Sequence, residues 1–409
     1  MSNFFWRQIL SPRMLVSFLM GFSCGVPLLL TSSLLQAWMT EQKVDLSVIG
    51  LYSLVGLPYT LKFLWAPVFD RFTLPLFGRR RGWMLLMQLL LMLALVGLGL
   101  TDPAQTPWLV ALAAFLVTLF SASQDIVIDA YRREDLSDHQ LGLGSSFYVN
   151  GYRLGMLLAG SGGMILADYM AFSRVYLMMA ASLLVGVVTT LACREPELTR
   201  GTPKSFAESV RDPFIEYFNR DRALLLLLFI LLYKLGDQMA STLTTPFYLD
   251  LGFSKTQVGA VAKLFGVSAA MAGGLIGGTI LLRIGIIRSL WIFGFLQAAA
   301  ILSFSVLALM GNSLVGLVGA IVLEQLTSGM GTSAYVAYMA SLTNKRFTAT
   351  QYALLSSCMG IPRVVFASPA GWVAEHTGWP LFFVGCTLAA IPGLLLLPKV
   401  SAQYSRDAQ

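Results

Sequence analysis

Nine ionisable residues stand inside runs of apolar sequence that are long enough to cross a lipid bilayer. They are Lys62, Asp125, Asp129, Arg153, Lys234, Asp237, Lys263, Glu324 and Arg363. A charged side chain at the centre of a membrane helix costs at least ~2.5–3.5 kcal/mol, so it usually faces a partner or a water-filled cavity. Because these residues occur in both halves of the chain, they indicate a polar path through a helical membrane protein, and therefore transport.

Asp125 and Asp129 are four residues apart and thus share one face of a helix, with Gln124 beside them. Two neighbouring carboxylates in a low dielectric cannot both ionise at little cost, which suits proton uptake and release. A plainer interpretation places Asp129 at the cytoplasmic end of its helix, where it is always solvated. Together with Asp237 and Glu324 in the second half, these two residues form the predicted proton-coupling set.

Arg153 and Arg363 fall near the middles of two corresponding apolar runs, where guanidinium groups can bind carboxylates with two parallel hydrogen bonds. Tyrosine rings at similar depth can stack on a sugar, although core packing explains them equally well. Lys234 and Asp237, at i and i+3, form an ion pair in a purely structural interpretation. The predicted substrate-binding set is Lys62, Gln124, Arg153, Tyr59, Tyr152, Lys234, Lys263, Arg363 and Gln36.

The segment after the second apolar run reads Ala66-Pro67-Val68-Phe69-Asp70-Arg71-Phe72, followed by Gly78-Arg79-Arg80-Arg81-Gly82. It resembles the major facilitator signature G-x-L-A-D-R-x-G-R-R, with Ala66 in place of the first glycine and the extra residues 73–77. Asp70, at a helix end, could pair with a basic group across the interface of the two halves in one access state and lose it in the other. The predicted gating set is Asp70, Arg71, Arg79, Arg80 and Arg81. The alternative is a basic cytoplasmic loop.

The composition requires membrane helices to position these residues. Of 409 residues, 56% are hydrophobic and 12% are charged, whereas soluble chains carry about 25% charge. Windows of about 19 residues predict twelve spans. Their limits are 12–38, 46–68, 82–101, 107–130, 140–167, 173–193, 223–248, 255–283, 288–309, 313–340, 350–373 and 379–397. We therefore expect an all-α polytopic membrane protein.

The basic residues set the predicted orientation. With both termini cytoplasmic, twenty of the 28 Lys and Arg residues, Arg132 among them, fall inside, and only three, Lys43, Arg174 and Lys255, fall outside. This is the positive-inside bias of an even number of spans. The net charge of +7 is thus a topology signal and gives no reason to expect nucleic-acid binding.

The two halves resemble each other. The segment that begins at Gln140 matches the segment that begins at Gln351 in its Gln, Leu, Ser and Ser residues, and Gly50 matches Gly259 at nearly the same offset. Two parallel six-helix repeats are typical of major facilitator transporters. The predicted domains are a bundle over 1–193, a linker over 194–222 and a bundle over 223–409. The linker is predicted to contain a short amphipathic helix on the cytoplasmic face, with Asp212-Pro213 as a typical helix start and a disordered loop as the alternative. The apolar residues at helical spacing are Phe206, Val210, Phe214, Tyr217 and Phe218.

Other kinds of site find little support. The four cysteines lie singly, without the spacing of a disulfide framework or zinc site, and we expect no metal and no cofactor besides a proton gradient. No Walker sequence and no recognisable catalytic set is present, so we do not expect an enzyme.

Several short motifs point to a narrower family. The chain resembles the AmpG family of anhydromuropeptide permeases. The resemblance is carried by residues 21–27 (GFSCGVP), 61–67 (LKFLWAP), 121–127 (SASQDIV), 232–237 (LYKLGD) and 329–334 (GMGTSA). It implies proton-coupled import of N-acetylglucosaminyl-anhydro-muramyl peptides across the bacterial inner membrane for cell-wall recycling, with a link to β-lactamase induction.

The predicted function is therefore proton-driven symport of an anionic glycopeptide by a monomer. One alternative keeps transport but changes the cargo to another anionic metabolite, such as an acyl-coenzyme. A second is a membrane sensor that transports nothing, although the chain has no large sensor domain. A membrane-embedded enzyme is the third.

Overall fold

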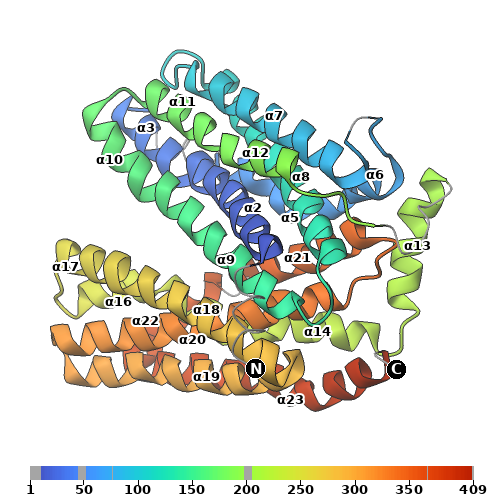
Figure 1. Ribbon diagram of the computed structural model, residues 1–409. Coiled ribbons are helices and arrows are strands. Elements are labelled where there is room, and N and C mark those ends of the chain that lie inside the picture. Colours follow the sequence, from blue (N-terminus) through green and yellow to red (C-terminus); the bar gives the residue numbers. More distant parts are fainter. Residues whose placement is uncertain (1–10, 45–51, 76, 198–204, 366, 408–409) are drawn as a thin grey trace. The chain divides into compact units, whose positions relative to one another are not determined.

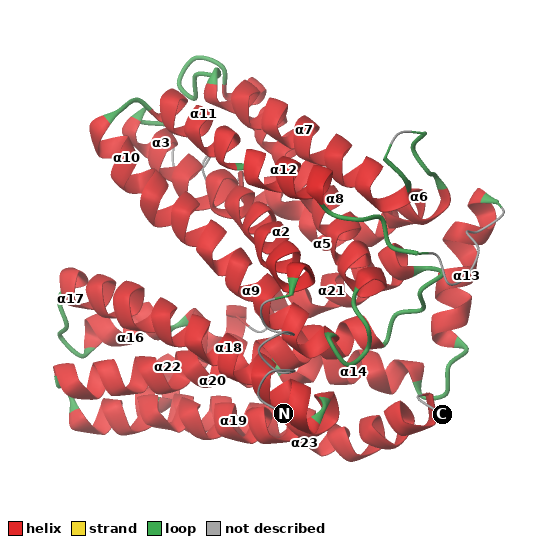
Figure 2. Ribbon diagram, in the orientation of Figure 1, coloured by secondary structure: helices red, strands yellow, loops and turns green. Residues whose placement is uncertain are grey.

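The computed structural model describes residues 11–44, 52–75, 77–197, 205–365 and 367–407, and within these ranges every regular element is a helix (Figure 2). Nine helices in this part of the chain are long and apolar enough to cross a membrane. The predicted all-α membrane class is confirmed.

The helices of the first half, whose α-helices Figure 1 labels, correspond to the first six predicted spans. Their bounds are α2 Pro12–Leu29, η1 Leu30–Leu34, α3 Leu35–Glu41, η2 Tyr52–Gly56, α5 Leu57–Leu61, η3 Lys62–Leu64, α6 Ala66–Arg71, α7 Arg79–Gly99, α8 Pro107–Asp135, α9 Leu141–Leu157, η4 Leu158–Gly162, α10 Gly163–Tyr169, α11 Phe172–Ser182 and α12 Leu184–Ala192. The pieces η1 and η4 are π-helical turns that contact each other.

The linker helix and the second half follow the same plan. Their bounds are α13 Phe206–Phe218, α14 Ala223–Tyr233, α15 Leu235–Thr242, α16 Thr244–Asp250, α17 Lys255–Ala260, η5 Val261–Gly266, α18 Val267–Ile284, α19 Ile286–Met310, α20 Leu314–Ser341, α21 Thr348–Val365, α22 Ala367–Thr377 and α23 Trp379–Asp407. Lys263 lies in the π-helical turn η5.

Three predicted spans are helical without being among the nine long apolar helices. The span 46–68 consists of short pieces with Pro58 and Pro67 at helix starts, and its first residues lie outside the described part. The span 140–167 is α9, η4 and α10, and it carries buried polar residues such as Ser145 and Asn150. The span 350–373 contains α21 and α22, which lie on either side of residue 366, outside the described part. All three spans are helical where the structure describes them.

The linker helix differs in detail from its prediction. It is helical, but it begins at Phe206, so Pro213 lies inside it rather than at its start. The Ser205 hydroxyl accepts a hydrogen bond from the Glu208 backbone N–H at 3.1 Å, which satisfies a free amide at the helix N-terminus. This cap places the start well before the position that the proline indicates.

Contacts divide the chain into two compact units. The first comprises residues 1–213 together with 342–357, and the second comprises 214–341 together with 358–409. The segment 342–357, which we call the docking segment, therefore packs with the helices of the first half although it belongs to the second half of the sequence. The boundaries at 193 and 223 stay a prediction from the sequence.

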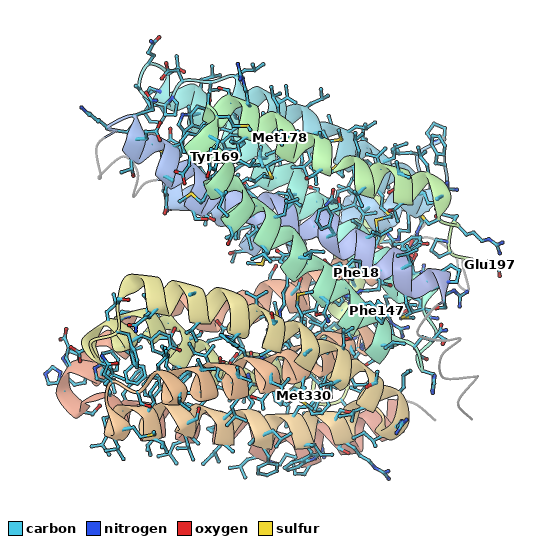
Figure 3. The ribbon with its side chains drawn as sticks, turned by 60° about the vertical axis from the view of Figure 1, so that its left-hand side comes forward. Phe18, Phe147, Tyr169, Met178, Glu197 and Met330 are labelled. Carbon is cyan, nitrogen blue, oxygen red and sulfur yellow. The ribbon has the colours of Figure 1, made fainter. Side chains whose placement is uncertain are left out.

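Close helix packing in the first unit depends on glycines. A Cβ added to Gly21 or Gly25 of α2 would collide with the backbone carbonyl of Tyr148 or Tyr152 on α9. Gly151 of α9 approaches the backbone of Phe18 in the same way, and Figure 3 labels Phe18 on α2. Small residues of this kind let two membrane helices touch along their backbones. As a result, α9 lies directly against α2.

Glycines also allow close helix packing in the second unit. Gly273 and Gly277 of α18 lie against the backbone of Leu326 and Met330 on α20, and Met330 is labelled in Figure 3. Gly329 of α20 approaches the carbonyl of Ala270 in return. This contact fixes α20, the helix that carries Glu324.

We expect Gly25→Ala to destabilise the protein by at least about 2 kcal/mol, because the new Cβ has no space against the Tyr152 carbonyl and a backbone must shift. Thermal unfolding in detergent would measure the loss. Gly97→Ala is the matched control, since no neighbouring helix comes within 4 Å of its Cβ position. Equal melting temperatures for the two variants would contradict this account of the packing.

Candidate functional site: buried charges in each unit

The first buried cluster is built around the second half of α8. Every residue from Ser121 to Arg133 is buried, although the stretch contains Gln124, Asp125 and Asp129. The cluster, which we call the first-unit cluster, comprises Lys62, Gln124, Asp125, Asp129 and Arg132. A helix that is buried on all sides is normally apolar on all sides. This one is polar where it is buried.

Lys62 lies at the junction of α5 and η3, where the helix is broken, and it is 7% exposed. Its ammonium group interacts electrostatically with both Asp125 and Asp129. Asp129 also forms an ion pair with Arg132 at 2.9 Å. The structure therefore gives each carboxylate a cationic neighbour, as burial of a charge requires.

Hydroxyl and amide groups surround these charges. Tyr59 donates to Ser121 Oγ at 2.9 Å, and Gln124 Nε2 lies 3.6 Å from the Cys24 sulfur. Gln124 Oε1 and Asp125 Oδ1 are buried and have no hydrogen-bond partner among the described residues. These two acceptors are free to bind a proton donor or a polar ligand.

The second-unit cluster comprises Lys234, Asp237, Gln297 and Glu324. Lys234 stands at the break between α14 and α15, and its Nζ lies 3.2 Å from Asp237 Oδ2 and 3.3 Å from Gln297 Oε1. The predicted Lys234–Asp237 ion pair is thus present. Glu324 lies on α20, interacts directly with Asp237 and accepts a hydrogen bond from Gln325 at 2.9 Å. Two acids and a lysine here form one interacting group.

The third site, which we call the Asp70 network, is built on a single carboxylate. Asp70 is fully buried and accepts hydrogen bonds from Arg80 Nη2 at 2.9 Å, from the backbone N–H groups of Ala349 and Thr350 at 3.2 and 2.9 Å, and from the Thr350 hydroxyl at 2.8 Å. The carboxylate therefore holds the first turn of α21, which belongs to the docking segment. Negative charge at a helix N-terminus is stabilising because it faces free amides and the positive end of the helix dipole.

Asp70 does form an ion pair, but the prediction that its partner is a basic group of the other half is wrong. The base is Arg80 of the same half, and the contribution of the second half is the backbone and hydroxyl of α21. Glu134 binds both Arg79 and Arg80 at 2.6 Å. The chain reverses between α6 and α7, so that Arg80 reaches back to Asp70.

The remaining predicted residues are placed less centrally. Arg71 lies over the Phe72 ring at 5.6 Å, and Arg81 donates to the carbonyls of Thr190 and Leu191 at the end of α12. Gln36 is exposed on α3. Tyr152 lies beside Tyr148 on α9 with ring centroids 6.3 Å apart, and Arg153 is half-buried next to it. The side chains of Lys263 and Arg363 lie outside the described part of the structure.

Sequence reasoning missed several members of these sites. The basic-residue count places Arg132 among the cytoplasmic loop residues, but it is 2% exposed and belongs to the first-unit cluster. Its i, i+3 spacing from Asp129 could have shown this, since the same spacing revealed Lys234 and Asp237. Gln297, Glu134 and Thr350 gave no such signal, because their partners are distant in sequence.

Comparison with known proteins places this architecture in a family. The sequence model of the Major Facilitator Superfamily matches residues 13–367. The chain belongs to the Major Facilitator Superfamily. Among solved structures, the fucose:proton symporter of E. coli has a TM-score of 0.73 at 12% identity, covering 96% of this chain and 99% of that one. A proton:xylose symporter has a TM-score of 0.71 at 11% identity, covering 97% and 96%. At such identities these likenesses concern the fold.

Sequence relatives are much more similar. The anhydromuropeptide permease of Escherichia coli K12 is 43% identical over 411 residues, which cover 99% of this chain and 84% of that protein. An uncharacterized protein of Haemophilus influenzae is 40% identical over 409 residues, with 97% and 96% covered. The resemblance to the AmpG family that the short motifs predict is confirmed. This chain is a multi-pass membrane protein of a transporter family.

We expect Thr350→Val to loosen the docking segment and Asp70→Asn to loosen it more, because a hydrogen bond to a charged group contributes ~1.5–3 kcal/mol. The reporter is Ala353→Cys, at a buried position, introduced into a variant without native cysteines. Its thiol should react with a soluble maleimide about tenfold faster or more when the docking segment is loosened.

Thr332→Val is the matched control, since that hydroxyl bonds to the Ser328 carbonyl of its own helix. Unchanged reactivity of the introduced thiol in the Asp70→Asn protein would show that the Asp70 network does not hold the docking segment.

Proposed function

We propose that this chain is a proton-coupled symporter that imports anhydromuropeptides across the bacterial inner membrane for cell-wall recycling, with both termini in the cytoplasm. The observation that carries the proposal is 43% identity with an anhydromuropeptide permease over 99% of this chain. The strong excess of basic residues on one side of the predicted topology supports the orientation. By delivering muropeptides to the cytoplasm, the same activity would link cell-wall turnover to β-lactamase induction.

The buried charges support the chemistry of such a cargo. An anhydromuropeptide carries sugar rings and peptide carboxylates, and it needs cations and hydrogen-bonding groups in its path. Tyr59 donates to Ser121 of α8, the helix that carries Gln124, and Lys62 interacts with Asp125 and Asp129 of the same helix. Arg153 lies on α9. We assign Arg153 and Arg363 to the peptide carboxylates, because guanidinium groups bind carboxylates through two parallel hydrogen bonds.

The carboxylates support the proton coupling. Asp125 and Asp129 in the first unit, and Asp237 and Glu324 in the second, are buried next to other charged groups. A buried carboxylate near an acid and a base changes its protonation with small changes of surroundings. Proton binding at these groups would therefore depend on the position of the cargo and the helices.

Uptake into proteoliposomes with an imposed inward proton gradient tests the function. We expect labelled N-acetylglucosaminyl-anhydro-muramyl peptide to accumulate, and unlabelled peptide to compete. Acyl-coenzyme A competing in its place would identify the alternative cargo. Binding without any accumulation would favour a sensor that does not transport.

We expect Asp125→Asn to slow proton-driven uptake by at least about tenfold while leaving substrate exchange at equal pH nearly unchanged. Asparagine keeps the shape of the side chain but cannot carry the proton, and exchange does not require its release. Asp168→Asn is the control, since Asp168 is exposed on α10. Proton-driven uptake at the wild-type rate would remove Asp125 from the coupling set.

A further inference from the structure

Arg132 joins three helices through one guanidinium group. It stands near the C-terminal end of α8 and is 2% exposed. Its Nη1 donates to Ser145 Oγ of α9 at 3.1 Å, and its guanidinium carbon lies 4.4 Å from the centre of the Tyr148 ring. Both contacts tie Arg132 to α9, which α2 holds in place through its glycines. Arg132 is therefore joined to α9 as well as to its own helix.

The other terminal nitrogen of Arg132, Nη2, contacts both Asp129 and the docking segment. Nη2 donates to Asp129 Oδ1 at 2.9 Å and to the Tyr352 hydroxyl at 3.0 Å. Each Nη atom of arginine carries two hydrogens, so one nitrogen serves one carboxylate and one tyrosine at the same time. Tyr352 is the fifth residue of α21 and lies in the docking segment. The planar guanidinium cannot move away from one partner without disturbing the other.

The charge on Asp129 decides how firmly Arg132 is held. An ionised carboxylate accepts a charge-assisted hydrogen bond, which is about twice as strong as a neutral one. A protonated Asp129 loses that attraction, and a buried guanidinium left without an anion becomes costly. The other titratable groups that act on Asp129 come from every neighbouring element. They are Lys62 of η3, Asp125 of α8, Cys24 of α2, Tyr148 and Tyr152 of α9 and Tyr352 of α21.

The repeat shows that this arrangement occurs in one half only. At the offset that aligns Gln140 with Gln351, Arg132 corresponds to Thr343 and Asp129 corresponds to Ala340. The second half thus has neither the base nor the acid at these positions. At these positions the charged contact is therefore particular to the first half.

We propose that Arg132 is a positioning residue that couples the protonation of Asp129 to the release of the docking segment through Tyr352. The proposal rests on the proposed proton coupling and names the path by which a proton acts on α21. With Asp129 ionised, Arg132 is held in place and Tyr352 stays bound. Protonation of Asp129 frees the guanidinium, and the first turns of α21 separate from α8 and α9.

Hydrogen–deuterium exchange of the peptide that spans residues 342–357 tests this in the purified full-length protein, without substrate. In the wild type, we expect the amides of this peptide to be less protected from exchange at pH 5 than at pH 8. Protection is corrected for the change of the intrinsic exchange rate with pH. Tyr352→Phe and Asp129→Asn should each lower protection at pH 8 by about tenfold and abolish its pH dependence. The double variant should lose no more than either single variant.

Tyr335→Phe is the matched control, because the Tyr335 hydroxyl donates to the Ile230 carbonyl within the second unit. Arg132→Lys, which keeps the charge but cannot serve both partners from one planar group, should also abolish the pH dependence. Additive effects in the double variant, or a pH dependence retained by Tyr352→Phe, would overturn the proposal. Since no cargo is present, this result is independent of which molecule the protein transports.

Discussion

The cost of burying charge in an apolar environment is the constraint on which the rest of this structure depends. A lone ion inside a membrane helix bundle is expensive, so each one must be paired, hydrogen-bonded or protonated. Asp129 is paired with Arg132, Lys234 with Asp237, and Asp70 with Arg80. Every one of these pairs makes a bond that a change of protonation or a helix movement can break, and a transporter needs such bonds.

Glycine contacts hold in place several of the helices that surround the buried charges. The backbones of α2 and α9 touch because Gly21, Gly25 and Gly151 have no Cβ, and this brings α9 and its tyrosines against the polar face of α8. In the second unit, the contact of α18 with α20 holds Glu324 close to Asp237. The ion pairs themselves join residues of one helix or of consecutive helices, and the glycines set the positions of helices packed around them.

The sequence alone predicts much of this fold, since apolar runs identify membrane helices with few ambiguities. It also predicts the ion pairs whose members share a helical stretch, such as Lys234 and Asp237, because their spacing is fixed by the helix itself. It does not predict Asp70 with Thr350, or Arg132 with Tyr352, since these partners lie more than two hundred residues apart. Helical spacing predicts the existence of α13 but not its start, because a serine cap outweighs a proline signal.

The same distinction explains why the sequence misplaces Arg132. Counting it as a cytoplasmic loop residue follows from the positive-inside rule, which treats bases near helix ends as solvated. In the structure α8 continues to Asp135, and the surrounding helices cover its last turns. Burial of a helix end is a tertiary property that a count of basic residues does not report, and the i, i+3 spacing of Arg132 from Asp129 is its local sign.

Proton movement during transport is the most direct test of the central claim, that these buried charges couple cargo to protons. Substrate is added to weakly buffered proteoliposomes that contain the protein, and the external pH is followed with an electrode. The account predicts a rise in external pH that begins with the addition of anhydromuropeptide and is abolished by a protonophore. Accumulation of the peptide with no accompanying proton uptake would contradict it.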